Sequence, residues 1–327
     1  MSEHTDNAFD QWYMLAMADE LAPQQARRYQ LLGLPVVLWR GEHEARAWLD
    51  QCPHRGAALS LGQVSGDTLA CPYHGWQFDA VGKCRHYPAH PGREPSEQAQ
   101  VRTFRCIEQD GCLWVCPGTP RRPPPRLPQV GDPAYRTLLV CQTTVAANAY
   151  RVIENFLDMA HFGFVHPGTL GAGDDREIAA YRIETHDDGF IARDCRVIQR
   201  QGNLQAQGPA EVLYDYELIA LTSAVLHKKG ADSARASDVI RLFVVPLDEE
   251  RSQLRMHLSY DYAEAVSEAD VTAFNQSILL EDVPILESQR PARLPLYTAL
   301  EVSQPADLSS IQYRRHLKRL EIGYGVF

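Results

Sequence analysis

Two short segments in the first quarter of the chain each carry one cysteine and one histidine. The first reads Cys52-Pro-His54, and the second, after 16 intervening residues, reads Cys71-Pro-Tyr-His74. A zinc finger takes two cysteines from one segment and two histidines from the other, whereas each segment here offers one thiolate and one imidazole. A two-iron cluster with two thiolates on one iron and two imidazoles on the other needs this mixed pairing. We therefore predict a [2Fe-2S] cluster on these four residues.

The residues around these ligands suit tight, cluster-binding loops. A proline follows each cysteine, and Gly56 and Gly75 follow the two histidines within two residues. Such loops can aim backbone amides at the cluster sulfurs, which tunes the reduction potential. Imidazoles in place of two thiolates raise that potential, as in a Rieske centre. Two alternatives stay open at this point: a zinc site built from the same four residues, and chance spacing without a metal.

A second polar cluster lies near the middle of the chain. If this segment forms a helix, Asn155, Asp158 and His161 are spaced three apart and share one helical face. His166 lies five residues after His161, about 140° around a regular helix, so both imidazoles can meet one metal only if the helix opens between them. Gly163 is well placed for such an opening, and we predict a π-bulge or an early helix end near it.

Two histidines and one carboxylate on one face of an octahedron form the facial triad of non-haem Fe(II) sites. The carboxylate must come from another part of the chain, and a helix predicted over residues 268–289 offers the best candidate. Asp282 falls inside the apolar stripe of that helix, whereas Glu281 lies to its side. A buried aspartate is costly unless it is paired or metal-bound, so Asp282 is the predicted third ligand. The alternative is a buried carboxylate satisfied by an arginine or by the backbone. The stripe consists of Val271, Phe274, Ile278, Ile285 and Gln289.

A proline-rich stretch divides the elements that must position these residues. Prolines at 117–128 fix the backbone and remove amide donors, so this stretch cannot join a central strand or a helix interior. We predict a first domain over 1–117, a connector over 118–128 and a second domain over 129–327. In the first domain, short apolar runs alternate with turn residues, which is typical of a small all-β unit. These runs lie at 36–39, 100–104 and 112–115.

The second domain combines strands with two helices and lacks regular alternation of strand and helix. This order favours an antiparallel sheet with helices packed against it, so the predicted fold class is α+β. Tyr214 and Tyr216 share one face of a predicted strand, because side chains alternate along a strand. The predicted strands cover 138–145, 181–183, 190–198, 211–221, 239–245 and 253–262, and the helices cover 152–165 and 268–289.

Composition and charge narrow the class of protein further. The net charge of −10 over 327 residues, most of it after residue 128, repels phosphates and anionic lipid, so we expect neither a nucleic acid nor a membrane as partner. The acidic first residues lack a signal-peptide pattern, and no apolar run approaches the roughly 18 residues of a membrane span. We expect a soluble, cytoplasmic protein. Eight cysteines are too few for a disulfide scaffold. The expected bystander thiols are Cys84, Cys106, Cys112, Cys116, Cys141 and Cys195.

Both halves of the chain resemble the Rieske-type non-haem iron aromatic ring-hydroxylating oxygenases, in the order of that family. The resemblance rests on the Cys-x-His and Cys-x-x-His motifs, then on the run from Asn155 to His166 and the Glu281-Asp282 pair. It implies a terminal oxygenase with an N-terminal all-β Rieske domain and a helix-grip-like catalytic domain. It implies a cluster on Cys52, His54, Cys71 and His74, and mononuclear iron on His161, His166 and Asp282.

The resemblance also assigns two supporting residues. Asp158 corresponds to the carboxylate that bridges a Rieske histidine of a neighbouring subunit to an iron-ligand histidine, and Asn155 to a polar residue near the iron. Electron transfer between subunits implies a head-to-tail ring, most often a homotrimer. The sequence contains no Gly-x-Gly-x-x-Gly opening a helix and no ferredoxin-type cysteine run. Electrons are therefore expected from NAD(P)H through a separate reductase of the ferredoxin or flavin type.

The short chain and the motif around His161 look like the branch that contains vanillate O-demethylase and dicamba monooxygenase. This favours aromatic compound catabolism by monohydroxylation, or O- or N-demethylation, of a small aromatic or heterocyclic substrate. A cis-dihydroxylating dioxygenase, a Rieske electron carrier without its own catalysis and a zinc-stabilised binding protein remain as alternatives. Arg241 and His257 are the polar candidates for substrate contact. Their alternative roles are a surface charge and a satisfied sheet residue.

Overall fold

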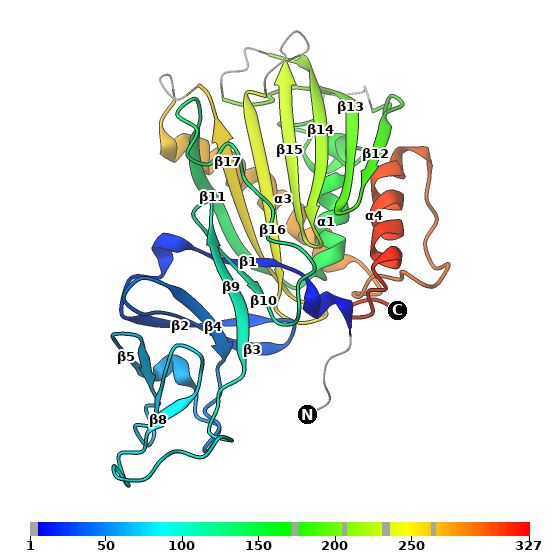
Figure 1. The fold of residues 1–327 in the computed structure, drawn as a ribbon. Helices are drawn as coiled ribbons and strands as arrows, with labels where there is room; N and C mark the ends of the chain where they lie inside the picture. The colour runs from blue at the N-terminus through cyan, green and yellow to red at the C-terminus, as the bar shows by residue number, and fades with distance from the viewer. Residues whose placement is uncertain (1–5, 172–175, 205–207, 231–235, 263–265) are drawn as a thin grey trace. The chain divides into compact units, whose positions relative to one another are not determined.

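The computed structural model describes residues 6–171, 176–204, 208–230, 236–262 and 266–327. These residues form two compact units, and the division after Arg126 falls inside the proline-rich stretch. Residues 1–5 of the predicted first domain lie outside the described part of the chain. Antiparallel sheets dominate both units and helices accompany the second, so the predicted α+β class is confirmed (Figure 1).

The first unit contains two antiparallel sheets. Its core packs Trp39 edge-on against Trp48, with ring centroids 4.8 Å apart, and includes the buried Cys52 and Cys71. The loops that carry the two Cys/His motifs are thereby anchored in the core. The larger sheet has the order β1 (Tyr13–Met17), β10 (Cys112–Cys116), β9 (Thr103–Gln109), β4 (Ala45–Leu49), β3 (Leu34–Arg40) and β2 (Gln25–Leu31). The smaller sheet contains β5 (Gln63–Ser65), β6 (Thr68–Ala70), β7 (Gln77–Phe78) and β8 (Cys84–His86).

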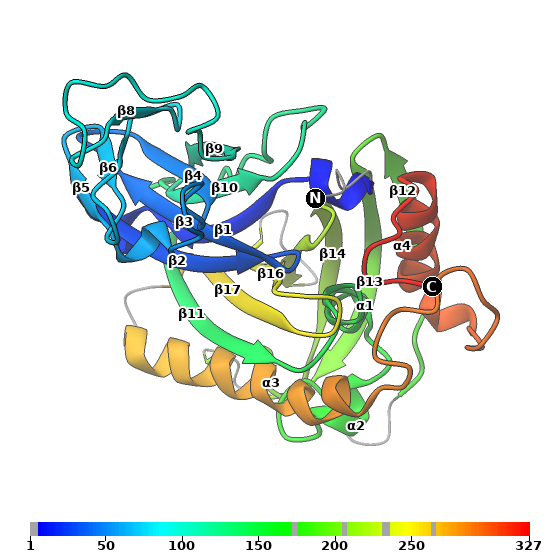
Figure 2. The same ribbon diagram turned by 90° about the horizontal axis from the view of Figure 1, so that it is seen from below.

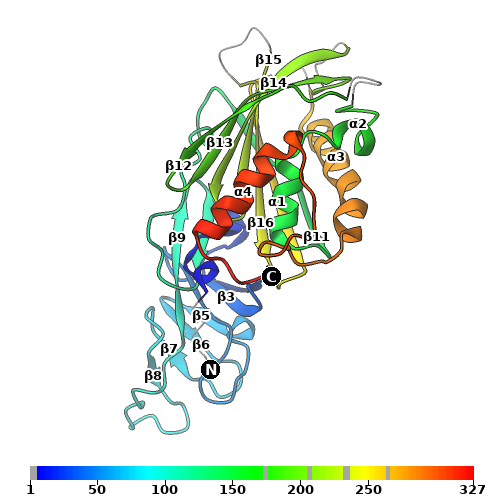
Figure 3. The same cartoon turned by 90° about the vertical axis from the view of Figure 1, so that its right-hand side faces the viewer.

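The second unit is a seven-stranded antiparallel sheet with helices against it. Helices α1 (Ala149–Leu157), α3 (Glu268–Ser288) and α4 (Leu308–Arg319) lie on the same face of the sheet (Figure 3), and α3 runs along β11 toward α1 (Figure 2). All six strands predicted for the second domain are present, whereas β15 and α4 were not predicted. The sheet order is β11 (Arg136–Val145), β17 (Ser252–Tyr260), β16 (Asp238–Pro246), β15 (Ser223–Gly230), β14 (Ala210–Ala220), β13 (Gly189–Gln199) and β12 (Arg182–His186).

The predicted helix over 152–165 is interrupted earlier than expected. Helix α1 ends at Leu157, and a separate four-residue helix, α2, covers Phe162–Val165. Asp158 has extended backbone angles (φ −91°, ψ 141°), and its carboxylate accepts the amides of Ala160 (3.0 Å) and His161 (3.1 Å). An aspartate that bonds the following amides competes with helix continuation. The prediction of a break near Gly163 was therefore wrong in position, and so was the shared helical face of Asn155, Asp158 and His161.

Helix α3 matches the predicted range, but its buried face differs from the predicted stripe. Within the predicted stripe, Val271 is buried and Phe274 and Ile278 are partly buried, but Ile285 is exposed. The buried positions of α3 are Val271, Asn275, Leu279, Asp282 and Leu286. Asp282 is nevertheless buried, as predicted. Over the described residues, no helix combines the length and apolar composition that crossing a bilayer requires.

Candidate functional site

The two Cys/His segments form loops with the same backbone hydrogen bonds. In the first loop, which follows β4, the amide of Cys52 donates to Ala57 O (2.8 Å) and the amide of Gly56 donates to Cys52 O (2.9 Å). The second loop joins β6 to β7 and repeats both bonds from Cys71, at 2.8 and 3.0 Å. Gly56 and Gly75 adopt φ values of +74° and +69°, which favour glycine. The glycines therefore serve the tight loops that the sequence predicted.

The side chains of these loops lie together and suit an iron–sulfur cluster. The rings of His54 and His74 have centroids 4.6 Å apart, and Trp76 stacks on His54 at 4.3 Å. Nδ1 of His54 is buried without a hydrogen-bond partner among the described residues, a costly state that a metal would relieve. Burial, with a smaller contribution from the thiol of Cys71, raises the pKa of Cys52 to about 11. A bound metal stabilises the thiolate form that such a thiol would otherwise not reach.

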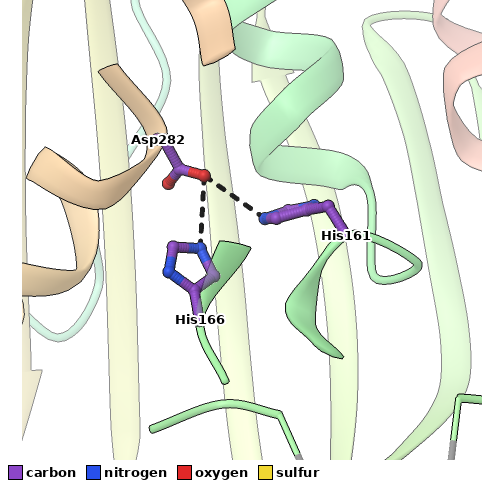
Figure 4. A group of neighbouring side chains, drawn as sticks. All are labelled: His161, His166 and Asp282. Carbon is purple, nitrogen blue, oxygen red and sulfur yellow. Dashed lines mark ion pairs between the residues drawn. The ribbon is translucent and has the colours of Figure 1, made fainter. Parts of the chain in front are cut away.

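Three side chains of the second unit converge on one point. His161 precedes α2, His166 follows it, and Asp282 projects from α3 toward both (Figure 4). Oδ1 of Asp282 lies 3.4 Å from Nε2 of His161 and 3.2 Å from Nε2 of His166. All candidate ligand atoms lie within 4.8 Å of one another. Two imidazoles and one carboxylate at this spacing can hold a divalent iron with open coordination positions.

Each of the two histidines has a further carboxylate at its Nδ1 atom, the nitrogen that does not face Asp282. Nδ1 of His161 lies 2.8 Å from Asp158 Oδ2, and Nδ1 of His166 lies 2.7 Å from Glu281 Oε2. Metal-binding histidines commonly donate their second N–H to such a group, which fixes the ring orientation and leaves Nε2 for the metal. Burial by itself would raise the pKa of Asp158, but hydrogen bonds from His161 and nearby amides lower it overall. Burial would lower the pKa of His166, yet Asp282 and Glu281 raise it.

The end of helix α1 also contacts this site. Asn155, in its last turn, donates through Nδ2 to Asp282 Oδ1 at 3.2 Å. The hydroxyl of Ser309 donates to the terminal carbonyl of Leu157 at 2.8 Å. The end of α1 is therefore tied both to the carboxylate of α3 and to α4. These contacts place Asn155 beside Asp282, one of the three candidate metal ligands.

A cavity opens beside the three converging side chains. Strand side chains alternate across a sheet, and Ile240, Leu242 and Met256 face the cavity. Arg241 and His257 point to the other face. The prediction that these two residues line the pocket was therefore wrong. The cavity is lined mainly by Asn155, Phe156, His161, Phe162, His166, Leu170, Tyr214, Tyr216, Leu226, Lys228, Ile240, Leu242, Met256, Phe274, Ile278, Leu279 and Asp282.

Arg241 and His257 have contacts of their own on that other face. Arg241 donates to the Ser259 hydroxyl at 2.8 Å and to the Gln129 side chain at 2.5 Å. His257 packs edge-on against Phe243, and burial, with nearby arginine charges, lowers its pKa to about 3. His257 is therefore neutral and part of the sheet interior.

Two charged residues near the candidate iron site were not predicted from the sequence. Glu281 was set aside because its position on α3 lies to the side of Asp282, but its longer side chain reaches His166. Lys228 belongs to β15, a strand that was not predicted. Burial also raises the pKa of Cys84 and Cys141, two of the cysteines expected to be bystanders. Burial raises the pKa of Cys106, Cys116 and Cys195 to about 12, so these thiols stay protonated.

Paired Cys/His loops in an all-β unit, and a two-histidine, one-carboxylate site in a sheet-and-helix unit, together define the class of Rieske non-haem iron oxygenases. Comparison with known proteins agrees with this class. Residues 11–105 match the model of the Rieske [2Fe-2S] domain. Residues 145–321 match the vanillate O-demethylase oxygenase C-terminal domain, which covers more than half of the chain. This chain belongs to the Rieske oxygenase family with a catalytic domain of the vanillate O-demethylase type.

Individual relatives lie in the same family. Methylxanthine N1-demethylase NdmA of Pseudomonas putida is 31% identical over 299 residues, which cover 89% of this chain and 82% of NdmA. The solved structure of NdmA with caffeine has a TM-score of 0.84 at 29% identity, covering 96% of this chain and 91% of that chain. The oxygenase component of dicamba O-demethylase from Stenotrophomonas maltophilia is 34% identical over 200 residues, 60% of this chain and 54% of its own length. Oxidoreductase NdmD of Pseudomonas putida is 36% identical over 113 residues, 34% of this chain and 19% of NdmD.

Proposed function

We propose that this chain is the oxygenase component of a demethylase, which removes an O- or N-methyl group from a small aromatic or heterocyclic substrate. The observation that carries this proposal is the largely apolar cavity beside His161, His166 and Asp282. Its remaining wall is largely aromatic and aliphatic, as is usual for small-molecule sites. A flat ring carrying a methyl group suits such a wall, and the relatives named above act on methylxanthines and dicamba.

Each metal-binding residue has a distinct part in this proposal. Cys52, His54, Cys71 and His74 hold the Rieske cluster. His161, His166 and Asp282 hold Fe(II), which supplies O2 activation when bound. Asn155 orients the Asp282 carboxylate through its 3.2 Å hydrogen bond, and Glu281 orients His166.

Asp158 is proposed as the entry point for electrons. Its Oδ2 already binds Nδ1 of His161, so one further N–H donor on the same carboxylate would connect the iron ligand to a second imidazole. A Rieske histidine of a neighbouring copy is the proposed donor. A head-to-tail homotrimer would provide this contact in every copy.

The reaction balances as a methyl hydroxylation. One O2, two electrons and two protons convert the methyl C–H bond to C–OH and release one water. The bond between the hydroxymethyl carbon and the oxygen or nitrogen then breaks. The hydroxyl proton passes to that heteroatom, and the carbon leaves as formaldehyde. The electrons are proposed to come from NAD(P)H through a separate reductase, for which the similarity to oxidoreductase NdmD is support. A cytoplasmic location is proposed because all eight cysteines are free thiols.

A single-turnover experiment tests the proposal without requiring the natural reductase. The purified, iron-loaded chain is reduced with dithionite, freed of excess reductant and exposed to O2 with caffeine, 4-methoxybenzoate or benzoate. Formaldehyde and a demethylated product from one of the methylated compounds support a demethylase. A cis-diol from benzoate, with no formaldehyde from either methylated compound, contradicts it and supports a dioxygenase.

Metal analysis of the same preparation separates the remaining alternatives. About three irons per chain, with acid-labile sulfide, agree with a cluster and a mononuclear site. Two irons per chain would indicate an electron carrier. Zinc without acid-labile sulfide would indicate a zinc-stabilised binding protein.

A further inference from the structure

Away from the candidate metal ligands, one lysine lies on the largely apolar wall of this cavity. Lys228, near the end of β15, lines this cavity and is only 4% exposed. Its neighbours on the same face are Leu226 on its own strand and Tyr214, its direct partner on β14. Burial lowers its pKa to about 8, so the ammonium form still predominates at neutral pH. A charged group is thus held in an apolar pocket, where an unpaired charge is costly.

The described surroundings give this charge no carboxylate at ion-pair distance, although the charge of nearby Asp238 partly offsets the effect of burial on its pKa. Nζ of Lys228 donates to the backbone carbonyl of Gly202, and no carboxylate of the described residues lies within 4 Å of it. Asp238 is its cross-strand neighbour but is bonded elsewhere. Asp238 accepts from Tyr262 (2.6 Å), Ser237 (2.9 Å) and Asn203 (3.2 Å), and it does not line the cavity.

A chain of ring contacts connects this cation to the candidate iron site. The Tyr214 ring centroid lies 5.8 Å from Nζ of Lys228 and 6.3 Å from the ring centroid of Phe162. Phe162 in turn lies 4.9 Å from the ring of His161, between centroids. The ammonium and the iron ligands are therefore separate features of one cavity wall, with aromatic surface between them. A ring that rests on this surface could turn one substituent to the iron and another to Lys228.

We propose that Lys228 is a specificity-determining residue that binds a carboxylate on the substrate. This inference rests on the proposed function and narrows its substrate class to aromatic acids that carry a methoxy or methylamino group. A single ammonium neutralises one carboxylate and gives a charge-assisted hydrogen bond, which is stronger than a neutral one. A neutral methylated ring would give the ammonium no charged partner inside the cavity.

Two nearly isosteric ligands test the proposal. Binding of 4-methoxybenzoate and 4-methoxybenzamide to the iron-loaded chain is measured by calorimetry under anaerobic conditions, so that no turnover occurs. The wild-type chain is expected to bind the acid about 10- to 100-fold more tightly, as a charge-assisted hydrogen bond implies. In Lys228→Met this preference disappears, and in Lys228→Arg much of it returns. Equal affinity of the wild-type chain for the two ligands overturns the proposal.

A matched variant controls for general charge effects. Lys229, the next residue, forms an ion pair with Asp215 at 3.0 Å outside this cavity. Lys229→Met should keep the preference for the acid, and its loss there would contradict a specific role for Lys228. Thermal unfolding of Lys228→Met without ligand adds a second readout. A lower melting temperature together with an unchanged preference would show that Lys228 is structural and overturn the proposal.

The binding measurement is independent of the proposed reaction. If the acid binds in a Lys228-dependent manner but yields no formaldehyde in a single turnover, the demethylase proposal fails and the carboxylate site stands. If both ligands, or caffeine alone, are demethylated and Lys228→Met does not change their relative affinity, the carboxylate site fails and the demethylase proposal stands.

Discussion

The histidines of the Rieske loops and those of the catalytic unit have different surroundings. Nδ1 of His54 is buried and has no partner among the described residues. At the catalytic site, Nδ1 of both His161 and His166 is hydrogen-bonded to a carboxylate, and Nε2 of both faces Asp282. The first arrangement leaves Nδ1 for a metal and the second leaves Nε2. The same residue type thus offers a different atom according to its neighbours.

The two regions also differ in what holds them together. Each Rieske loop is closed by backbone hydrogen bonds that span at most five residues. The catalytic site depends on side chains that are more than 100 positions apart, such as His166 and Glu281. A locally closed loop keeps its shape when a distant residue changes. In a site built from several elements, the removal of one carboxylate is enough to leave a metal-binding histidine without a fixed orientation.

The largest effect is expected from removing an iron ligand of the catalytic unit. In His166→Ala, iron should fall from about three to about two per chain and product formation should be lost. The visible absorption of the Rieske cluster should remain, because the loops of the first unit are closed by their own hydrogen bonds. Iron analysis and absorption spectroscopy measure both outcomes. Loss of the cluster in this variant would contradict the independence of the two regions.

A smaller but still large effect is expected at Asp158, the proposed entry point for electrons. Asp158→Asn should retain both metals, yet coupled product formation should fall by about 100-fold, because a neutral amide cannot orient two N–H donors in the same way. Asp248 offers a matched control. It accepts the amides of Glu250 and Arg251 and the Arg251 side chain, which is the same local pattern at a surface turn. Asp248→Asn should keep activity, and full activity in Asp158→Asn would exclude the bridging role.

Loss of the Glu281 carboxylate should weaken iron binding without abolishing it. Glu281→Gln removes the charge beside His166 Nδ1, and such changes typically cost 10- to 100-fold in metal affinity. Titration of the apo catalytic site with Fe(II) measures the effect. Glu287→Gln on the same helix is the control, since Glu287 accepts the backbone amide of Ala146 at 2.9 Å. Equal iron affinities in the two variants would leave Glu281 without a positioning role.

The smallest effect is expected in a Rieske loop. Gly75 has φ +69°, and a Cβ there would approach Pro88 Cγ to 3.0 Å, so Gly75→Ala should lower the free energy of unfolding by about 1–2 kcal/mol. Gly92→Ala meets no atom within 4 Å and should change stability little. Chemical denaturation of the cluster-loaded chain compares the two. An equal response would mean that the loop tolerates a side chain at Gly75.

Sequence reasoning succeeded where the information is local. The Cys/His spacing, the loop glycines and the six predicted strands depend on short segments, and the structure contains them. The helix was predicted to break near Gly163, because glycine tolerates unusual backbone angles. The break lies earlier, because the side chain of Asp158 ends α1 by accepting the amides of residues 160 and 161. The competition between side chain and backbone is a local signal that could have located the break.

The face of the sheet could not be read from alternation. In β16 and β17 nearly every residue is buried, so neither set of alternating positions is polar enough to mark the solvent side. Arg241 and His257 therefore looked like pocket residues although Ile240, Leu242 and Met256 face the cavity. The place of Lys228 in the cavity was not predicted either, because lysine side chains are normally exposed.

The sequence alone determined the chemistry of this protein: four candidate cluster ligands in two loops, two histidines near the middle of the chain and one buried aspartate on a long helix. Those inferences follow from residue type and short spacing, which the chain carries whether folded or not. Only the tertiary structure decided which carboxylates bind the outer nitrogens of the histidines, which sheet face forms the cavity and that a lysine lies in it. These features depend on contacts between distant elements, and such contacts exist only after the sheet and helices have packed.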